Sequence, residues 1–155
     1  MIEGQTLSQG PSESVTCVRS GRDRAPFIFD MELGPGRRGP PTHTHDEGDE
    51  IIEVVSGTIT FRVNGQDTVL APGDRLTLTP KDAHTFWNPS RTEVVRCRVT
   101  HGARFERAMD QPSFAQLAMH LALIDPGASR MASPFVRGTL WLVAQIGRLR
   151  RLRPT

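Results

Sequence analysis

The sequence predicts an all-β domain followed by a helical appendage at its C-terminus. Short segments in which apolar and polar residues alternate recur over the first hundred residues, and turns rich in Gly, Pro and Asn separate them. Apolar residues at helical spacing appear only beyond residue 102. Short strands at this spacing are typical of a β-sandwich or a β-barrel. We therefore expect a flexible lead-in over 1–14, one β domain over 15–101, and C-terminal helices with a basic tail over 102–155.

The strands are predicted from period-two patterns. The segment FIFDMEL at 27–33 places four apolar residues on one face and two acidic residues on the other, as in a half-buried strand. Strands at 50–56 and 58–63 follow, and Asn64-Gly65 after them favours a type I′ hairpin turn. Further strands are expected near 68–70, 75–79, 84–87 and 93–100. About eight short strands can hide their sheet edges by closing into a barrel or by stacking two sheets.

Two helical segments are predicted after the strands. The first covers 105–123, with a break near its start at Pro112. The second begins at Ser133-Pro134, an N-cap residue followed by a proline in the first turn, and runs to about Leu152. Its apolar stripe has no predicted partner within the chain, so we expect a homodimer.

The charge distribution divides the chain into two parts. Residues 1–125 carry 13 basic and 17 acidic side chains, a balance of −4, whereas 126–155 carry six arginines and no acidic residue. Acidic residues therefore dominate the remainder, and no aromatic residues interleave with the tail arginines, so no nucleic-acid partner is expected. We interpret the arginine tail as a solvated helix end.

The sequence also indicates where the protein is expected to function. The first residues are polar and lack the apolar core of a secretory signal, and no apolar stretch approaches the ~20 residues of a membrane span. The two cysteines, Cys17 and Cys97, do not form a disulfide framework. A cytoplasmic location is the expectation.

One set of residues has the chemistry of a metal site. His43 and His45 lie two positions apart, so on an extended segment both side chains point to the same side. Glu50 begins the next predicted strand, and His84 belongs to a later one. Three imidazoles and one carboxylate suit Fe, Mn, Ni, Co, Cu or Zn better than Ca or Mg. A His-x-His pair also occurs by chance in loops, so the pair alone leaves metal binding open.

The spacing around these residues resembles the first conserved motif of the cupin superfamily, G-x5-H-x-H-x(3,4)-E-x6-G. His43, His45, Glu50 and Gly57 stand in its register, whereas Arg37 occupies the position of the leading glycine.

A second segment resembles the other cupin motif, G-x5-P-x-G-x2-H-x3-N. Gly73, His84 and Asn88 match its first glycine, its histidine and its asparagine, and Thr79 and Lys81 replace its proline and second glycine. The two motifs occur in order and at the separation that the family shows.

The resemblance implies a cupin-type jelly-roll β-barrel of six to eight strands with a metal centre in its mouth. One divalent transition metal ion (Fe, Mn, Ni, Co, Cu or Zn) would be held there by His43, His45, Glu50 and His84. Asp49 satisfies the shorter version of the motif, but only Glu50 also places Gly57 in register.

The implied function is a metal-dependent enzyme that acts on a small oxygen-bearing organic molecule, with a quercetin-dioxygenase-like oxygenase as the leading class. Glu50 would both bind the ion and accept a proton. A redox-neutral isomerase, lyase or cyclase and a non-catalytic small-molecule-binding cupin are the alternatives. Phe86 and Trp87 are candidates for a substrate pocket, although a core role fits either. His101 and His120 lie outside both motifs and are interpreted as surface or packing residues.

Overall fold

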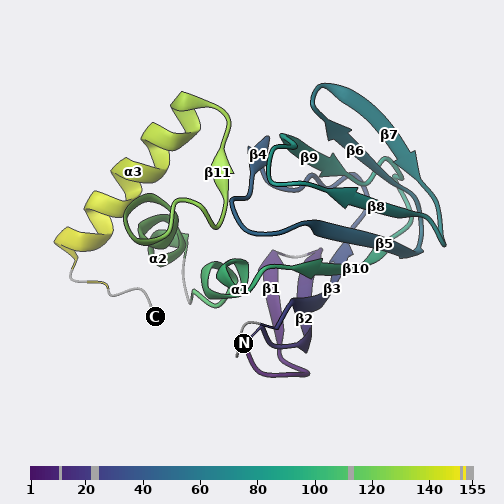
Figure 1. Ribbon diagram of the computed structural model, residues 1–155, viewed down its shortest axis with the longest axis horizontal. Helices are drawn as coiled ribbons and strands as arrows, with labels where there is room; N and C mark the ends of the chain where they lie inside the picture. The colour runs from purple at the N-terminus through teal and green to yellow at the C-terminus, as the bar shows by residue number, and fades with distance from the viewer. Residues whose placement is uncertain (11, 22–24, 112–113, 151, 153–155) are drawn as a thin grey trace.

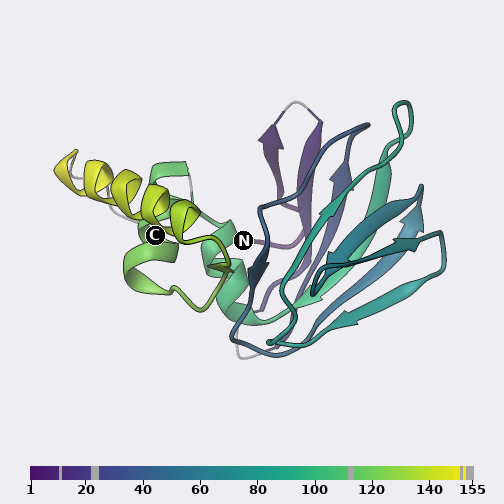
Figure 2. The same ribbon diagram turned by 90° about the horizontal axis from the view of Figure 1, so that it is seen from above.

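Two antiparallel sheets form the β part of the molecule (Figures 1 and 2). The computed structural model describes residues 1–10, 12–21, 25–111, 114–150 and 152. The first sheet contains, in spatial order, β1 (Thr6–Gly10), β2 (Glu13–Arg19), β3 (Phe27–Leu33), β10 (Val95–His101), β5 (Glu50–Ser56) and β8 (Arg75–Leu78). The second contains β11 (Arg130–Met131), β4 (His43–Thr44), β9 (His84–Trp87), β6 (Ile59–Val63) and β7 (Gln66–Leu70).

The main hydrophobic core lies between these sheets because alternate residues of each strand point inward. In β3 every second residue, from Phe27 to Leu33, is buried. Phe61 of β6 and Phe86 of β9 come from the other sheet and belong to the same core. The expected hairpin is confirmed: Asn64 and Gly65 join β6 to β7 with φ angles of 50° and 86°.

Two expectations about the strands need correction. The strands pair into two sheets and do not close into a barrel within the described part of the chain, so the jelly-roll expectation holds while closure does not. The first fourteen residues, expected as a flexible lead-in, contain β1, which pairs with β2. β1 has one strongly apolar residue, Leu7, and lies at a sheet edge, so burial imposes no alternation that the sequence would reveal.

The helical appendage lies at one end of the sheets (Figure 1). It consists of α1 (Ala103–Met109), α2 (Phe114–Met119), a π-helical turn labelled η2 (His120–Ile124), and α3 (Pro134–Leu149). The first predicted segment is thus divided after Met109, and Pro112, the expected break, lies outside the described residues. Ser133 caps α3 by accepting a hydrogen bond from the Val136 N–H, as predicted.

α3 is amphipathic and packs on α2 and η2. Its outer side remains open: Phe135, Trp141 and Leu149 are 81%, 54% and 83% exposed. Among the helices of the described residues, none has the length and apolar character of a membrane span.

Candidate metal centre

The four predicted ligands meet where the two sheets come together beside the appendage. His43 on β4 pairs in register with His84 on β9, and His45 follows β4. Glu50 is the first residue of β5 in the other sheet. The three histidines are at most 4% exposed, and a ligand atom from each of them lies within 4.8 Å of the others. The structure therefore brings together residues that lie up to 41 positions apart in the sequence.

Each of these three imidazole rings is oriented by a backbone carbonyl oxygen. A carbonyl oxygen can only accept a hydrogen bond, so the neutral ring carries its proton on Nδ1 and leaves the Nε2 lone pair free. This tautomer is the one that a metal-binding histidine needs when it coordinates through Nε2. The carbonyl groups of Pro41, Ala128 and Asp82 lie 2.9, 2.5 and 2.9 Å from Nδ1 of His43, His45 and His84, respectively.

The Glu50 carboxylate faces these free nitrogens. Its Oε2 atom lies 3.1 Å from Nε2 of His84 and 3.5 Å from Nε2 of His45. Oε2 of Glu50 and Nε2 of His84 are buried without a hydrogen-bond partner among the described residues. Two lone-pair-bearing atoms this close repel unless a cation or a proton lies between them. Ligand atoms about 2.0–2.2 Å from one ion lie about 3 Å apart at right angles, so the separations fit a shared divalent cation.

Electrostatics keep most of this cluster ready to bind a cation. Burial, reinforced by the neighbouring histidines, lowers the pKa of His43 to about 3, and burial also lowers the pKa of His45. For Glu50, burial opposes ionisation, but the contact with His84 and the other histidines outweighs it and lowers the pKa to about 2. For His84, burial is in turn outweighed by Glu50, which raises the pKa. A proton and a metal ion thus compete for Nε2 of His84.

His101 is a fourth buried histidine of this cluster that the sequence analysis did not place here. It is 2% exposed, and its Nε2 atom lies 4.0 Å from Glu50 Oε2. Its ring packs edge-on to His45 and stacks on Phe105, with both centroid distances at 4.2 Å. Of the two interpretations given, surface or packing residue, the surface one is wrong and packing agrees with these ring contacts. The signal was alternation: Val95, Cys97, Val99 and His101 occupy the inward positions of one strand.

The other residues considered for the site have different surroundings. Asp49 is exposed, which leaves Glu50 as the carboxylate that faces the histidines. His120 is buried in η2 at 4% exposure and belongs to neither cluster of candidate ligands found among the described residues.

A cavity of about 450 Å³ adjoins the cluster, and most of the side chains that line it are apolar. Of the two aromatic residues considered for a substrate pocket, Phe86 is among the residues that line the cavity and Trp87 is not. Neighbouring strand residues point to opposite faces, and the Trp87 ring instead packs beneath the guanidinium groups of Arg38 and Arg62. The appendage closes one side of the cavity with residues that include Phe105 and Leu121.

The loop between η2 and α3 connects this appendage to the candidate metal centre. Besides the Ala128 carbonyl on His45, the Gly127 carbonyl accepts a hydrogen bond from the Asp46 N–H at 2.9 Å. β11 then pairs with β4, the strand that carries His43. One of the three candidate imidazole ligands is therefore oriented by the appendage.

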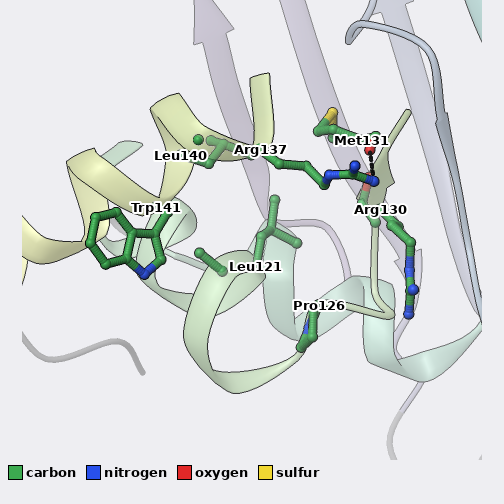
Figure 3. Close-up of a pocket in the computed structure, with 10 residues that line it drawn as sticks. Leu121, Pro126, Arg130, Met131, Arg137, Leu140 and Trp141 are labelled. Atoms are coloured by element: carbon green, nitrogen blue, oxygen red, sulfur yellow. Dashed lines mark hydrogen bonds between the residues drawn. The ribbon is translucent and has the colours of Figure 1, made fainter. Parts of the chain in front are cut away.

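A second pocket, of about 340 Å³, lies between α3 and the η2–β11 segment (Figure 3). Trp141 and Arg137 are among the side chains that border it, and Arg137 donates a hydrogen bond to the Met131 carbonyl at 3.5 Å. Four residues line both pockets: Leu121, Ser129, Met131 and Leu140. They thus form part of the wall between the second pocket and the cavity beside the histidine cluster.

Comparison with known proteins identifies the class to which this fold and site belong. The family model of the cupin domain matches residues 29–99, which include all four predicted ligands. Residues 29–99 therefore form a cupin domain. The match ends before α1, so the helical appendage lies outside it. No curated protein matches the sequence.

Solved cupin structures share the fold at low sequence identity. An RmlC-like cupin from Shewanella frigidimarina aligns with a TM-score of 0.56 and 18% identity over 64% of this chain and 84% of its own. A sugar phosphate isomerase from Silicibacter pomeroyi aligns with a TM-score of 0.52 and 19% identity over 62% of this chain and 69% of its own. The polyketide cyclase RemF from Streptomyces resistomycificus aligns with a TM-score of 0.52 and 19% identity over 60% of this chain and 66% of its own. These similarities establish the fold alone.

Proposed function

We propose that the protein is a mononuclear metal-dependent enzyme that acts on a small, largely apolar molecule bearing metal-binding oxygen atoms. One observation carries the proposal. Three imidazole rings with free Nε2 lone pairs and one carboxylate converge beside an apolar cavity of about 450 Å³. A cluster of such donors next to a pocket is the arrangement expected of a working metal site.

The proposed ligands are His43, His45, Glu50 and His84. These nitrogen and oxygen donors suit a divalent Fe, Mn, Ni, Co, Cu or Zn ion, and four protein ligands leave two positions in a six-coordinate shell. When bound, the ion would supply a Lewis acid for substrate oxygens and, if redox-active, a route for electrons to molecular oxygen.

The cavity wall indicates the class of substrate. Within the described residues, its charged side chains are Glu13, Arg38 and Glu50, and aromatic and aliphatic groups supply most of the surface. A sugar phosphate would need several cationic or N–H donors around its phosphate group, whereas this wall offers Arg38 alone as a permanent cation. An apolar body with an oxygen-bearing head fits the wall better.

Oxygen-dependent cleavage, of the quercetin-dioxygenase kind, is the leading reaction class. The apolar wall supports it because such a wall excludes water and accommodates both an aromatic substrate and molecular oxygen. In this reaction the chain's own residues would orient the substrate, and Glu50 would accept a proton from a substrate hydroxyl.

One observation favours a redox-neutral isomerase, lyase or cyclase as the second candidate. Glu13 lines the cavity, and burial raises the pKa of its carboxyl group while Arg37 partly opposes the rise. A carboxylate with a raised pKa is a better general base. Proton abstraction by Glu13 would not consume oxygen.

Oxygen uptake by the metal-loaded protein, measured with a panel of flavonoids and 1,3-diketones, distinguishes these possibilities. Uptake that requires both metal and substrate, and that His84→Ala abolishes, supports the oxygenase. Substrate conversion without uptake that is lost in Glu13→Gln supports redox-neutral chemistry. If the panel compounds bind without conversion in the fully loaded protein, the enzyme proposal is contradicted and a non-catalytic binding cupin remains.

The expected homodimer and the cytoplasmic location stay predictions. The exposed apolar side chains of α3 are consistent with a second copy covering that helix.

A further inference from the structure

The hydrogen bond to the His101 ring has the opposite sense from those of the other three histidines in the cluster. The backbone N–H of Gly102 points at His101 Nδ1 over 2.7 Å. A backbone N–H can only donate, so Nδ1 of His101 must be the acceptor and cannot carry a proton. The neutral ring therefore carries its proton on Nε2. In His43, His45 and His84 a carbonyl oxygen places the proton on Nδ1 instead.

This tautomer prevents His101 from acting as a ligand, because a protonated ring nitrogen has no lone pair to offer an ion. It makes Nε2 a hydrogen-bond donor whose side of the ring faces the Glu50 carboxylate. The distance from Nε2 to Oε2 is 4.0 Å, and both atoms are buried without a hydrogen-bond partner among the described residues. A movement of about 1 Å by either side chain brings them within hydrogen-bond distance. Stacking on Phe105 and edge-on packing against His45 fix the plane of the His101 ring.

We propose that His101 is a positioning residue of the metal centre, which donates its Nε2–H to the Glu50 carboxylate and is not itself a ligand. The proposal rests on the metal centre described above. Proximity alone leaves open whether His101 is a ligand, because His45, Glu50 and His101 also form a group close enough to hold an ion. The proposal assigns it the other role, that of a donor behind Glu50. A donor behind a coordinating carboxylate fixes the direction in which its lone pair points. Loss of such a contact typically weakens metal affinity by about 10–100-fold.

The tautomers can be observed directly by NMR. In protein labelled with ¹⁵N-histidine, long-range ¹H–¹⁵N correlations report which ring nitrogen carries the proton, and the signals missing from His101→Gln identify His101. In the zinc-loaded protein we expect a proton on Nε2 of His101 and on Nδ1 of His43, His45 and His84. A proton on Nδ1 of His101 would overturn the proposal. The metal-free protein should show the same His101 tautomer, so the proposal can be judged even if zinc fails to bind and the proposed function falls.

Zinc affinity, measured by competition with a chromophoric chelator, tests the role of the donor. His101→Gln, which retains an N–H near the position of Nε2, should stay within about threefold of the unmodified protein, whereas His101→Leu should weaken binding about 10–100-fold. His84→Ala serves as the ligand-loss control and should weaken it further. If zinc affinity falls as much in His101→Gln as in His84→Ala, His101 is a ligand and the proposal is contradicted. If His101→Leu binds zinc as tightly as the unmodified protein, His101 has no positioning role. Thermal unfolding of the metal-free variants checks that each one folds. If His101→Leu does not fold, the tautomer observed by NMR in the unmodified protein decides the proposal.

Discussion

Each candidate imidazole ligand is restrained at the nitrogen opposite its metal-binding lone pair. For His43 and His84 the restraining carbonyl lies two residues earlier in the chain, so local backbone conformation sets the ring. For His45 it belongs to Ala128, which lies 83 positions away. The His45 ring is thus correctly oriented only when the appendage is folded against the sheets, whereas the other two rings depend on their own loops.

Loss of a single imidazole should remove the metal without unfolding the sheets. We expect His45→Ala and His84→Ala each to weaken metal affinity by more than about 100-fold, beyond the usual effect of residues that only support a ligand. Elemental analysis after dialysis measures retention, and circular dichroism checks the sheets. Thr44→Ala is a matched control, since its side chain lies on the other face of the same strand. Full metal occupancy in both histidine variants would contradict the ligand assignment.

Asn88, the last residue of the second motif, has a structural role. It is 1% exposed, and its Nδ2 group donates to the carbonyls of Leu33, Gly34 and Glu93 at 3.0, 3.0 and 2.7 Å. Its Oδ1 atom accepts from the Ser90 N–H at 2.9 Å. One amide therefore satisfies backbone groups from two loops.

Asn88→Ala should lower the free energy of unfolding by about 2–4 kcal/mol, because it leaves several buried backbone groups without partners. Urea denaturation of the metal-free protein measures the change. Metal affinity should be nearly unaffected in the folded fraction. A loss below about 0.5 kcal/mol, the range of ordinary surface substitutions, would show that the loops do not depend on this side chain.

The sequence was sufficient to predict which side chains gather at the centre but not how His101 takes part. Motif spacing identifies His43, His45, Glu50 and His84, because alternation and the order of the strands bring them to one place. The role of His101 depends on a hydrogen bond from its neighbour's N–H and on its distance from Glu50. Both are properties of tertiary geometry that no local pattern encodes.

At the scale of elements, the loop between η2 and α3 joins the appendage to the sheets through charged groups. Arg104 of α1 forms a bidentate pair with Asp125, and Arg104 in turn lowers the pKa of that carboxyl group. Arg130 pairs with Asp46, beside His45, at 3.0 Å. The loop that presents Ala128 to His45 is thus held at both ends.

Asp125→Asn should loosen this loop, because it removes the negative charge that Arg104 binds. We expect a loss of stability of roughly 1–2 kcal/mol, since Arg104 is partly exposed and water screens the pair. Hydrogen exchange is the sharper readout: the Asp46 N–H, bonded to the Gly127 carbonyl, should exchange faster in the variant. Unchanged protection of that N–H would contradict the role given to the pair.

Glu106 of α1 gives the stability a defined pH dependence. It is 5% exposed and accepts hydrogen bonds from Ser20 Oγ at 2.8 Å, the Gly21 N–H at 2.7 Å and the Met1 amino group at 3.0 Å. Burial alone would raise the pKa of Glu106, but these donors outweigh it and lower the pKa below the ordinary 4.5. Stability from a lowered carboxyl pKa is present above that ordinary value and is lost as the pH falls through the folded-state pKa.

Glu106→Gln should therefore flatten the acid side of the stability profile. Urea denaturation at a series of pH values below neutrality measures the slope for both proteins. The unmodified protein should lose stability more steeply than the variant as the pH falls below 4.5. Parallel slopes would show that the carboxyl group is not preferentially ionised in the folded state. The lowered pKa of Asp82 contributes equally to both proteins and cancels in the comparison.

At the scale of the whole molecule, the sequence predicted the strands better than their assembly. Alternation and turn residues located β3, β5, β6 and the hairpin after it, because burial on one face imposes the pattern. Whether the sheet edges close into a barrel depends on pairings that no single strand encodes, and β4 and β11 are only two residues long. The docking of the appendage onto the cavity was also not predictable, because an apolar stripe does not specify the surface that covers it.

The resulting molecule combines a cupin framework with a wall that lies outside the region matched by the cupin family model. The framework supplies the four donors, and the appendage supplies both part of the cavity surface and the carbonyl that orients His45. The proposed metal chemistry requires that the four donors share one ion.

Anomalous diffraction from crystals grown with zinc, recorded on both sides of the zinc absorption edge, tests that requirement most directly. We predict one strong peak about 2.0–2.2 Å from Nε2 of His43, His45 and His84 and from a Glu50 carboxylate oxygen, with His101 beyond bonding distance. A zinc peak bound elsewhere, or none among these side chains at saturating zinc, would contradict the metal centre and the chemistry inferred from it.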